Sequence, residues 1–126
     1  MRVAVVGSRS IVDEEVIDKT LESIVGDANP TIISGGAKGV DSLAREYAKN
    51  NGLDFILFKP YHLVDTQAQY TPRYFFVRNK QIVDNCDTLI AFWDGKSKGT
   101  KHAIDYAEKM GKEVIICTVS EEDEDE

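Results

Sequence analysis

Residues 31–50 read TIISGGAKGVDSLAREYAKN and set the pattern for the rest of the chain. Residues 31–33 form a short apolar run typical of a buried strand, and residues 34–39 form a glycine-rich turn. From position 40 onward, apolar residues recur at helical spacing: Val40, Leu43, Ala44, Tyr47 and Ala48. A glycine turn that leads into a helix lets an anion approach the first helical amides. The stretch therefore predicts a strand, an anion-binding turn and a helix.

Two further stretches repeat this pattern. Residues 5–10 read VVGSRS, and residues 92–100 read FWDGKSKGT. In each, an apolar run breaks off at glycine and serine before a helical segment. Three such turns in 126 residues predict a ligand site.

The order of predicted elements decides the fold class. We expect strands at 2–6, 31–34, 54–58, 88–93 and 113–118, helices at 13–25, 39–50, 74–85 and 100–110, and a loop at 61–72. The inner face of the first helix is predicted to carry Val16, Ile17, Leu21 and Ile24, and the apolar stripe of the third to carry Phe75, Ile82 and Val83. Strands that alternate with helices, without hairpin turns, predict an α/β fold: a Rossmann-like, doubly wound open parallel sheet of about five strands with helices on both faces.

The charge is divided unevenly along the chain. The net charge is −7, but residues 121–126 carry six of the 22 acidic groups. The rest of the chain has 16 acidic residues and 15 Lys and Arg, so it is nearly neutral. We expect one domain over 1–118 and an acidic, disordered tail over 119–126, either solubilising or partner-binding. With two cysteines, no signal peptide and no apolar run of membrane length, we expect a cytoplasmic protein with buried, unpaired thiols.

Cations gather at one rim of the predicted sheet. All strands of a parallel sheet end at the same edge, and ligands bind there. The cations expected at that rim are Arg9, Lys38, Arg73, Arg78, Lys96, Lys98 and Lys101. His102 faces the same rim, either solvated or in contact with a ligand. Together with the helix N-termini, these cations predict a phosphate-bearing ligand. The chain lacks a P-loop, a dinucleotide G-x-G-x-x-G, a nucleophile elbow and zinc-ligand spacing, and we predict no metal or cofactor.

Three motifs carry a family resemblance. VVGSRS, ISGGAKGVDSLAREYA and RN-x-x-IVDNCDTLIAFWDGKSKGT resemble the SLOG superfamily, which includes the Smf/DNA-processing protein A domain and the Lonely Guy phosphoribohydrolases. The chain is most similar to the small, single-domain YspA-like branch, over about residues 1–118. The resemblance implies a nucleotide or nucleotide-derived ligand at the carboxyl ends of the strands.

The resemblance also implies the site residues. Glycine amides and the hydroxyls of Ser8, Ser97 and Thr100 would hold phosphate, Asp41 or Asp94 would accept from ribose hydroxyls, and Arg78 would pair with charge. Trp93 would either stack on a base or belong to the core. The full implied set is Gly7, Ser8, Arg9, Ser34, Gly35, Gly36, Gly39, Asp41, Arg78, Asn79, Asp94, Gly95, Ser97, Gly99 and Thr100.

The chain departs from the phosphoribohydrolases at one position. Their final motif, P-G-G-x-G-T-x-x-E, supplies a catalytic Glu, whereas this chain has Ala103 at that position. A methyl group cannot transfer a proton. We therefore predict a sensor or sequestering module. The alternatives are a hydrolase with a relocated carboxylate, for which Arg78, Asp41 and Asp94 are the catalytic candidates, and a single-stranded DNA-binding protein. The aromatics Tyr70, Tyr74, Phe75 and Phe76 lead us to expect a homodimer or a higher homo-oligomer.

Overall fold

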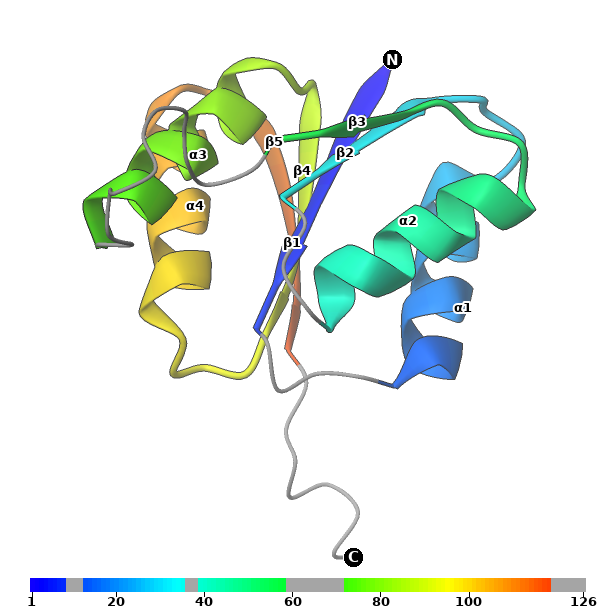
Figure 1. Ribbon diagram of the computed structural model, residues 1–126, viewed down its shortest axis with the longest axis horizontal. Helices are drawn as coiled ribbons and strands as arrows, with labels where there is room; N and C mark the ends of the chain where they lie inside the picture. Colours follow the sequence, from blue (N-terminus) through cyan, green and yellow to red (C-terminus); the bar gives the residue numbers. More distant parts are fainter. Residues whose placement is uncertain (9–12, 36–38, 59–71, 119–126) are drawn as a thin grey trace, which may run out of the picture.

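The computed structural model describes residues 1–8, 13–35, 39–58 and 72–118, and its elements form one parallel sheet flanked by helices (Figure 1). The strands are β1 (Arg2–Gly7), β2 (Thr31–Ser34), β3 (Phe55–Leu57), β4 (Thr88–Trp93) and β5 (Glu113–Thr118). The helices are α1 (Glu14–Val25), α2 (Val40–Asn50), α3 (Pro72–Asp84) and α4 (Lys98–Lys109). The strand order is β3-β2-β1-β4-β5, and every pair is parallel. The predicted doubly wound Rossmann-like fold is confirmed.

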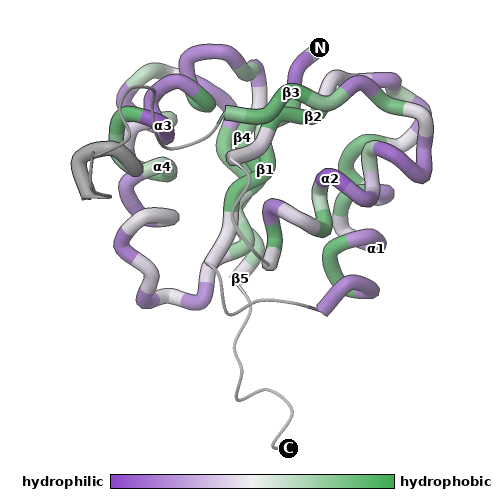
Figure 2. Tube along the Cα trace, in the orientation of Figure 1, coloured by the Kyte–Doolittle hydropathy of each residue, from purple (hydrophilic) through white to green (hydrophobic). Residues whose placement is uncertain are grey.

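The sheet separates two hydrophobic cores. Successive residues of a strand point to opposite faces, so Val3 and Val5 pack under α1 and α2, whereas Ala4 and Val6 pack under α3 and α4. Figure 2 shows the strands as a mainly hydrophobic centre between helices of mixed hydropathy. Both cores end at the strand tips, and polar side chains begin there.

Several element boundaries differ from the prediction. Helix α3 begins at Pro72 rather than at 74, because proline suits the first helical turn, and α4 begins at Lys98 rather than at 100. Strand β3 is shorter than the predicted 54–58. Val16, predicted to face inward, is exposed, and Val25 is buried in its place. The side chain of Phe75 and residues 119–126 lie outside the described part of the chain.

Both cysteines behave as packing residues. Cys86 is buried in the second core, and burial raises the pKa of its thiol to about 11. Cys117 is half-buried on β5, and burial raises the pKa of its thiol as well. Both thiols therefore stay protonated near neutral pH. Among the described residues, no group of acids, histidines and cysteines could hold a metal ion, and no helix is long and apolar enough to cross a membrane.

Candidate functional site

The carboxyl edge of the sheet brings together the strand ends that precede the three predicted turns. Because β1 lies between β2 and β4, the carboxyl ends of these three strands are neighbours. Helices α2 and α4 both begin near the carboxyl end of β1 (Figure 1). The first residue of α2 packs directly on that end: a Cβ added at Gly7 would lie 2.5 Å from a Val40 methyl group. Only glycine at position 7 lets α2 begin so close to β1.

Arg78 on α3 reaches across to the turn that follows β2. Its Nη1 donates to the Gly35 carbonyl at 2.9 Å, and its Nε donates to Asn79 Oδ1 at 3.2 Å. A Cβ at Gly35 would lie 1.9 Å from Arg78 Nη1, so the guanidinium occupies the space that a side chain would fill. Position 35 is therefore glycine because a cation lies against its backbone.

Asn79 joins the turn after β2 to the start of α4. It is only 4% exposed, and while its Oδ1 accepts from Arg78, its Nδ2 donates to the Gly99 carbonyl at 3.0 Å. One buried amide thus fixes both the guanidinium and the first turn of α4. The sequence placed Arg78 at this rim through the predicted topology and the resemblance, and Asn79 in the site through the resemblance; the structure supplies their contacts.

Helix α2 begins without a side-chain cap. Its N-cap residue is Gly39, with φ at 79°, which is a left-handed conformation suited to glycine, and no side chain at that position accepts from the first-turn amides. Asp41 lies in the first turn and is buried. A glycine N-cap supplies no side-chain acceptor to the first-turn amides, and the positive end of a helix dipole attracts anions.

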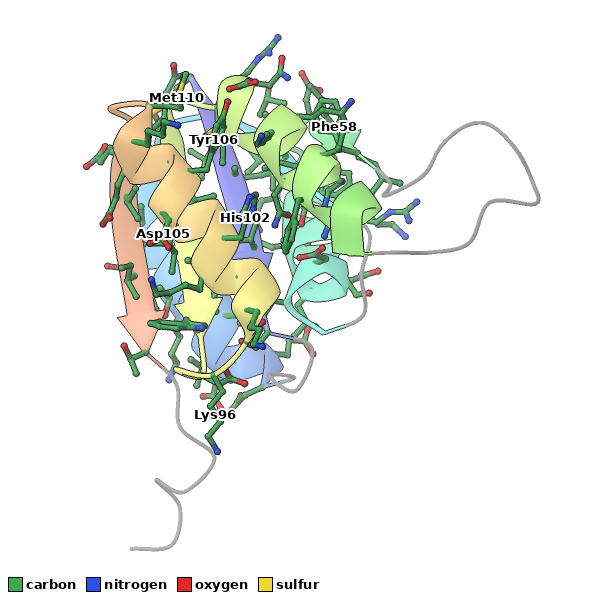
Figure 3. The ribbon with its side chains drawn as sticks, turned by 90° about the vertical axis from the view of Figure 1, so that its left-hand side faces the viewer. Phe58, Lys96, His102, Asp105, Tyr106 and Met110 are labelled. Carbon is green, nitrogen blue, oxygen red and sulfur yellow. The ribbon has the colours of Figure 1, made fainter. Side chains whose placement is uncertain are left out.

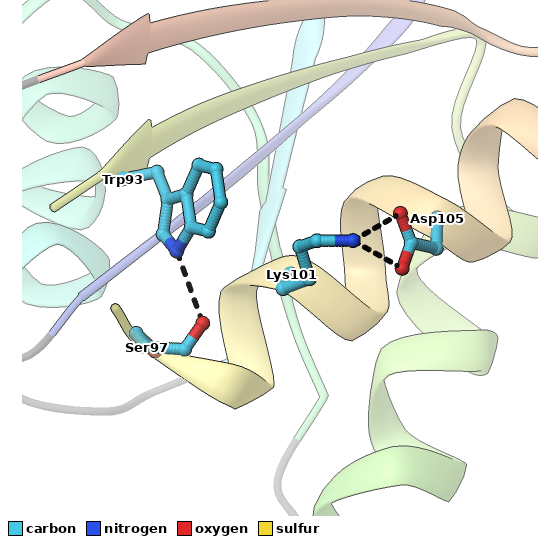
Figure 4. Close-up of polar contacts among 4 residues, drawn as sticks. All are labelled: Trp93, Ser97, Lys101 and Asp105. Atoms are coloured by element: carbon cyan, nitrogen blue, oxygen red, sulfur yellow. Dashed lines mark hydrogen bonds and ion pairs between the residues drawn. The ribbon is translucent and has the colours of Figure 1, made fainter. Parts of the chain in front are cut away.

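The turn between β4 and α4 is built differently. Asp94 Oδ1 accepts from the backbone amides of Lys96, at 2.8 Å, and Ser97, at 2.9 Å. Ser97 caps α4, since its Oγ accepts from the Thr100 amide, and its carbonyl accepts from Trp93 Nε1 at 3.0 Å (Figure 4). The side chains of Asp94 and Ser97 therefore satisfy the backbone amides of this turn and of the start of α4.

The remaining predicted hydroxyls also bond within the chain. Ser8 is buried at the end of β1, and its Oγ accepts from the Asp94 amide at 3.2 Å. Ser34 is fully buried, and its Oγ donates to the Val5 carbonyl at 2.7 Å. Thr100 is buried, with its Oγ1 3.3 Å from Ser97 Oγ. In the structure these side chains hold strands and turns together.

The described cations of the rim differ in what they contact. Lys96 projects away from the body of the molecule (Figure 3), and Lys98 is exposed. Lys101 pairs with Asp105 at 2.9 Å, an exposed contact of little energetic weight (Figure 4). Arg78 is the cation that the structure fixes against the backbone of a turn. Arg9, Gly36 and Lys38 lie outside the described residues, as does the side chain of Arg73; Gly95, predicted in the site, adopts φ 84° in the closed turn.

His102 extends the polar cluster along α4 toward α3 (Figure 3). Its ring stacks on Phe76 with centroids 4.3 Å apart, and its Nδ1 lies 3.5 Å from Asn79 Nδ2. Burial, aided by the charge of Lys80, lowers the pKa of His102 below its usual range. The imidazole is therefore neutral at pH 7. Sequence reasoning missed the stacking with Phe76, because nothing in the spacing shows how two helices face each other.

Two further residues are packed in the core. Ala103, at the position of the phosphoribohydrolase Glu, is 1% exposed and lies in the second core. Trp93 packs against the same core while its indole N–H bonds to Ser97. The structure thus supports the core alternative for Trp93 over the base-stacking one.

A hollow of about 490 Å³ lies elsewhere, between α1 and α2. It is lined near the C-terminal ends of both helices by Asp18, Lys19, Glu22, Ser23, Tyr47, Asn50 and Asn51. Carboxylates and the negative ends of helix dipoles disfavour an anion there. The first turn of α2 and Arg78 make the carboxyl edge the better candidate for a phosphate.

Comparison with known proteins supports the fold and the family resemblance. Residues 1–62 match the family model described as "YspA, cpYpsA-related SLOG family". The predicted resemblance to the SLOG superfamily is confirmed. No curated protein matches the chain.

Solved structures of the same fold are distant in sequence. DNA processing protein A from Streptococcus pneumoniae is 22% identical, with a TM-score of 0.78 over 95% of this chain and 51% of its own. The Helicobacter pylori DNA processing protein A, which binds single-stranded DNA, is 22% identical, with a TM-score of 0.74 over 92% of this chain and 64% of its own. The molybdenum cofactor carrier protein of Chlamydomonas reinhardtii is 19% identical, with a TM-score of 0.66 over 91% and 75%. This chain spans about half to two thirds of the two DNA processing proteins, and identities this low show the fold alone.

Proposed function

We propose that this SLOG-type protein binds a nucleotide or nucleotide-derived molecule through its phosphate, at the turn between β2 and α2, as a sensor or a sequestering module in the cytoplasm. The observation that carries the proposal is the Arg78 guanidinium held against the Gly35 carbonyl at one end of that turn, with the uncapped N-terminus of α2 at the other. A fixed cation and an open helix N-terminus are what a phosphate needs.

The rest of the ligand is assigned by position. Asp41, buried in the first turn of α2, is the acid nearest the proposed phosphate site, and we assign it to a ribose hydroxyl. Asp94 already accepts from two backbone amides of its own turn, so it is the weaker candidate for a ribose hydroxyl. Gly39 places no side chain at the start of α2, whereas the space beside Gly7 is filled by Val40. The masses of small molecules that copurify with the protein would identify the base and the number of phosphates.

Binding without turnover is the form of the proposal that Ala103 favours. A Glu at position 103 would be buried in an apolar core, so a carboxylate cannot be restored there without a large loss of stability. The alternative, a hydrolase with a relocated carboxylate, requires Asp41 or Asp94 to act with Arg78. Robust release of free base from a nucleoside monophosphate by the unmodified protein would overturn the binding-module proposal.

The DNA processing proteins raise single-stranded DNA binding as a second candidate, since the H. pylori protein has this activity and shares the fold. The near-neutral body of residues 1–120 and the acidic run of residues 121–126 disfavour a polyanion. Affinity for an oligonucleotide that falls steeply with salt would support the DNA alternative.

The direct test compares two arginines. Equilibrium dialysis with AMP and ADP-ribose measures affinity for the native protein, Arg78→Gln and Arg45→Gln. Arg45 is an exposed residue of α2, so its replacement removes one positive charge away from Gly35. We expect Arg78→Gln alone to lose most of the binding. Equal losses in the two variants would reduce the effect to general electrostatics and refute the assigned site.

A further inference from the structure

The two edges of the sheet are unequal. Strand β3 closes one edge with three residues, Phe55–Leu57. Strand β5 closes the other with six, and all six pair with β4 on the same side. Within the described residues, the other side of β5 faces no strand. A strand of this length leaves a row of backbone N–H and C=O groups available to a further strand.

The side chains of β5 are typical of a strand that is paired on both sides. Its apolar residues are Val114, Ile115, Ile116 and Cys117; none of them is fully buried, and Ile116 is 43% exposed. In β4, by contrast, residues 88–92 are all buried. Ile115 and Cys117 lie against the first core and Val114 against the second, so both faces of the edge are apolar.

The usual protections of an edge strand are missing from β5. Natural edges carry lysine, proline or a bulge that prevents pairing. Residues 113–118 contain neither lysine nor proline, and the β4–β5 register continues without interruption. The one charged side chain, Glu113, accepts from the Thr88 hydroxyl at 3.0 Å and so points back to β4.

We propose that the edge of β5 is an interface for a second copy of this chain, with the two β5 strands antiparallel about a twofold axis and the two sheets joined into one. Each copy offers the same row of backbone groups and the same apolar residues, so the contact is self-complementary, as a twofold interface requires. Ile116 of each copy is then covered by the other.

The acidic run favours the antiparallel arrangement. Residues 121–126 follow β5 in the chain and are all Glu or Asp. In an antiparallel pair, the two acidic runs begin at opposite ends of the interface. Their starting points are then separated by about the length of β5, which is about 20 Å at 3.3 Å per residue. Parallel addition would bring both runs to the same end, within the Debye length of about 8–10 Å, where they repel. Since β3 is too short for further pairing, assembly stops at the dimer.

This surface is separate from the aromatic segment 70–76 that the sequence suggested for oligomerisation. Three apolar-to-lysine variants separate the two surfaces, because all three replaced residues are exposed. Ile116→Lys lies on β5, Val77→Lys lies on α3 beside the aromatic segment, and Val16→Lys lies on α1, in neither segment. Each variant adds the same charge and removes a similar apolar side chain.

Sedimentation velocity of the full-length protein from about 1 to about 100 µM, the range in which micromolar dimers dissociate, tests the proposal. We expect the native chain to approach twice its 14.1 kDa mass, and Ile116→Lys to raise the dimer Kd about tenfold or more while Val16→Lys and Val77→Lys leave it unchanged. Circular dichroism should show the native helix content in Ile116→Lys, because the side chain is already exposed.

A native chain that stays monomeric at the highest concentration would overturn the proposal. A dimer lost in Val77→Lys but kept in Ile116→Lys would overturn it as well and assign the interface to the aromatic segment. Neither result tests ligand binding. Dialysis with AMP measures binding at the carboxyl ends of the strands, whereas the proposed interface runs along β5.

Discussion

Two segments at the same edge of the sheet, residues 35–39 and 94–97, precede helices of similar length. They differ in how the backbone amides at the start of each helix are satisfied. In the turn before α4, Asp94 and Ser97 satisfy the backbone amides themselves. In the turn before α2, Gly39 offers no side-chain cap, and a cation from α3 is bonded to the Gly35 carbonyl. A helix start that is already capped has less to offer an anion. The difference shows that segments with similar glycine-rich sequences can start a helix with different hydrogen bonds.

The sharpest test of this comparison is a methyl group added at Gly35, in the first turn, and at Gly99, in the first turn of helix α4. Gly35→Ala would put its Cβ on Arg78 Nη1, the far end of a flexible side chain that can move away. We expect a nearly native melting temperature but a loss of AMP affinity of about 3 kcal/mol, or 150-fold, because the charge-assisted contact goes with the arginine. Gly99→Ala meets nothing within 4 Å and is the matched control. Dialysis that finds equal affinities in the two alanine variants would contradict the assignment.

Removing one cation of α3 and one of α4 should have the next largest effect. Arg78→Gln should weaken binding by about 1.5–3 kcal/mol, the range for a hydrogen bond to a charged group. Lys101→Gln should change it less than about twofold, because Lys101 is exposed and already paired with Asp105. Isothermal titration calorimetry with AMP distinguishes the two. A larger loss in the lysine variant would move the phosphate to the α4 turn.

Loss of the α4 cap should show the reverse pattern. Ser97→Ala removes the oxygen that accepts from the Thr100 amide, which costs about 1 kcal/mol of unfolding free energy. For a chain of this size the melting temperature should fall by about 3–5 °C. Affinity for AMP should stay within about twofold, since the serine caps a helix rather than the ligand. A stable variant that no longer binds would show that the Ser97 hydroxyl holds phosphate after all.

The smallest effect belongs to the acidic run, which is part of neither turn. Residues 121–126 contain no apolar group to bury, so deleting them should leave the melting temperature and AMP affinity nearly unchanged. Thermal denaturation and dialysis check both quantities. A fall of several degrees would mean that the run docks on the folded domain.

Sequence patterns predicted the sheet better than they predicted the side-chain contacts. Strands 88–93 and 113–118 were predicted to the residue, because continuous apolar runs between turn signals are typical of buried parallel strands. Val16 was predicted on the wrong face, because a helix of 12 residues with several apolar positions allows more than one inner stripe.

The candidate site shows the same division. The glycines at 35 and 39 predicted a turn. Only the tertiary structure shows that Arg78, which is 43 residues after Gly35, contacts it. Ser8 and Ser97 read as phosphate ligands in a linear motif, yet each bonds to a backbone amide nearby in space. A hydroxyl near glycine has the same sequence signature in both roles.

The central place of β1 has a consequence for how the chain is made. Strand β1 is flanked by β2, which follows soon after it, and by β4, whose neighbour Asp87 accepts from the Arg2 amide across 85 residues of sequence. During synthesis, the segment through β3 can assemble while one side of β1 still waits for a strand that has not left the ribosome. For that interval the central strand of the finished sheet is an open edge. Its protection then depends on the speed of translation and on chaperones.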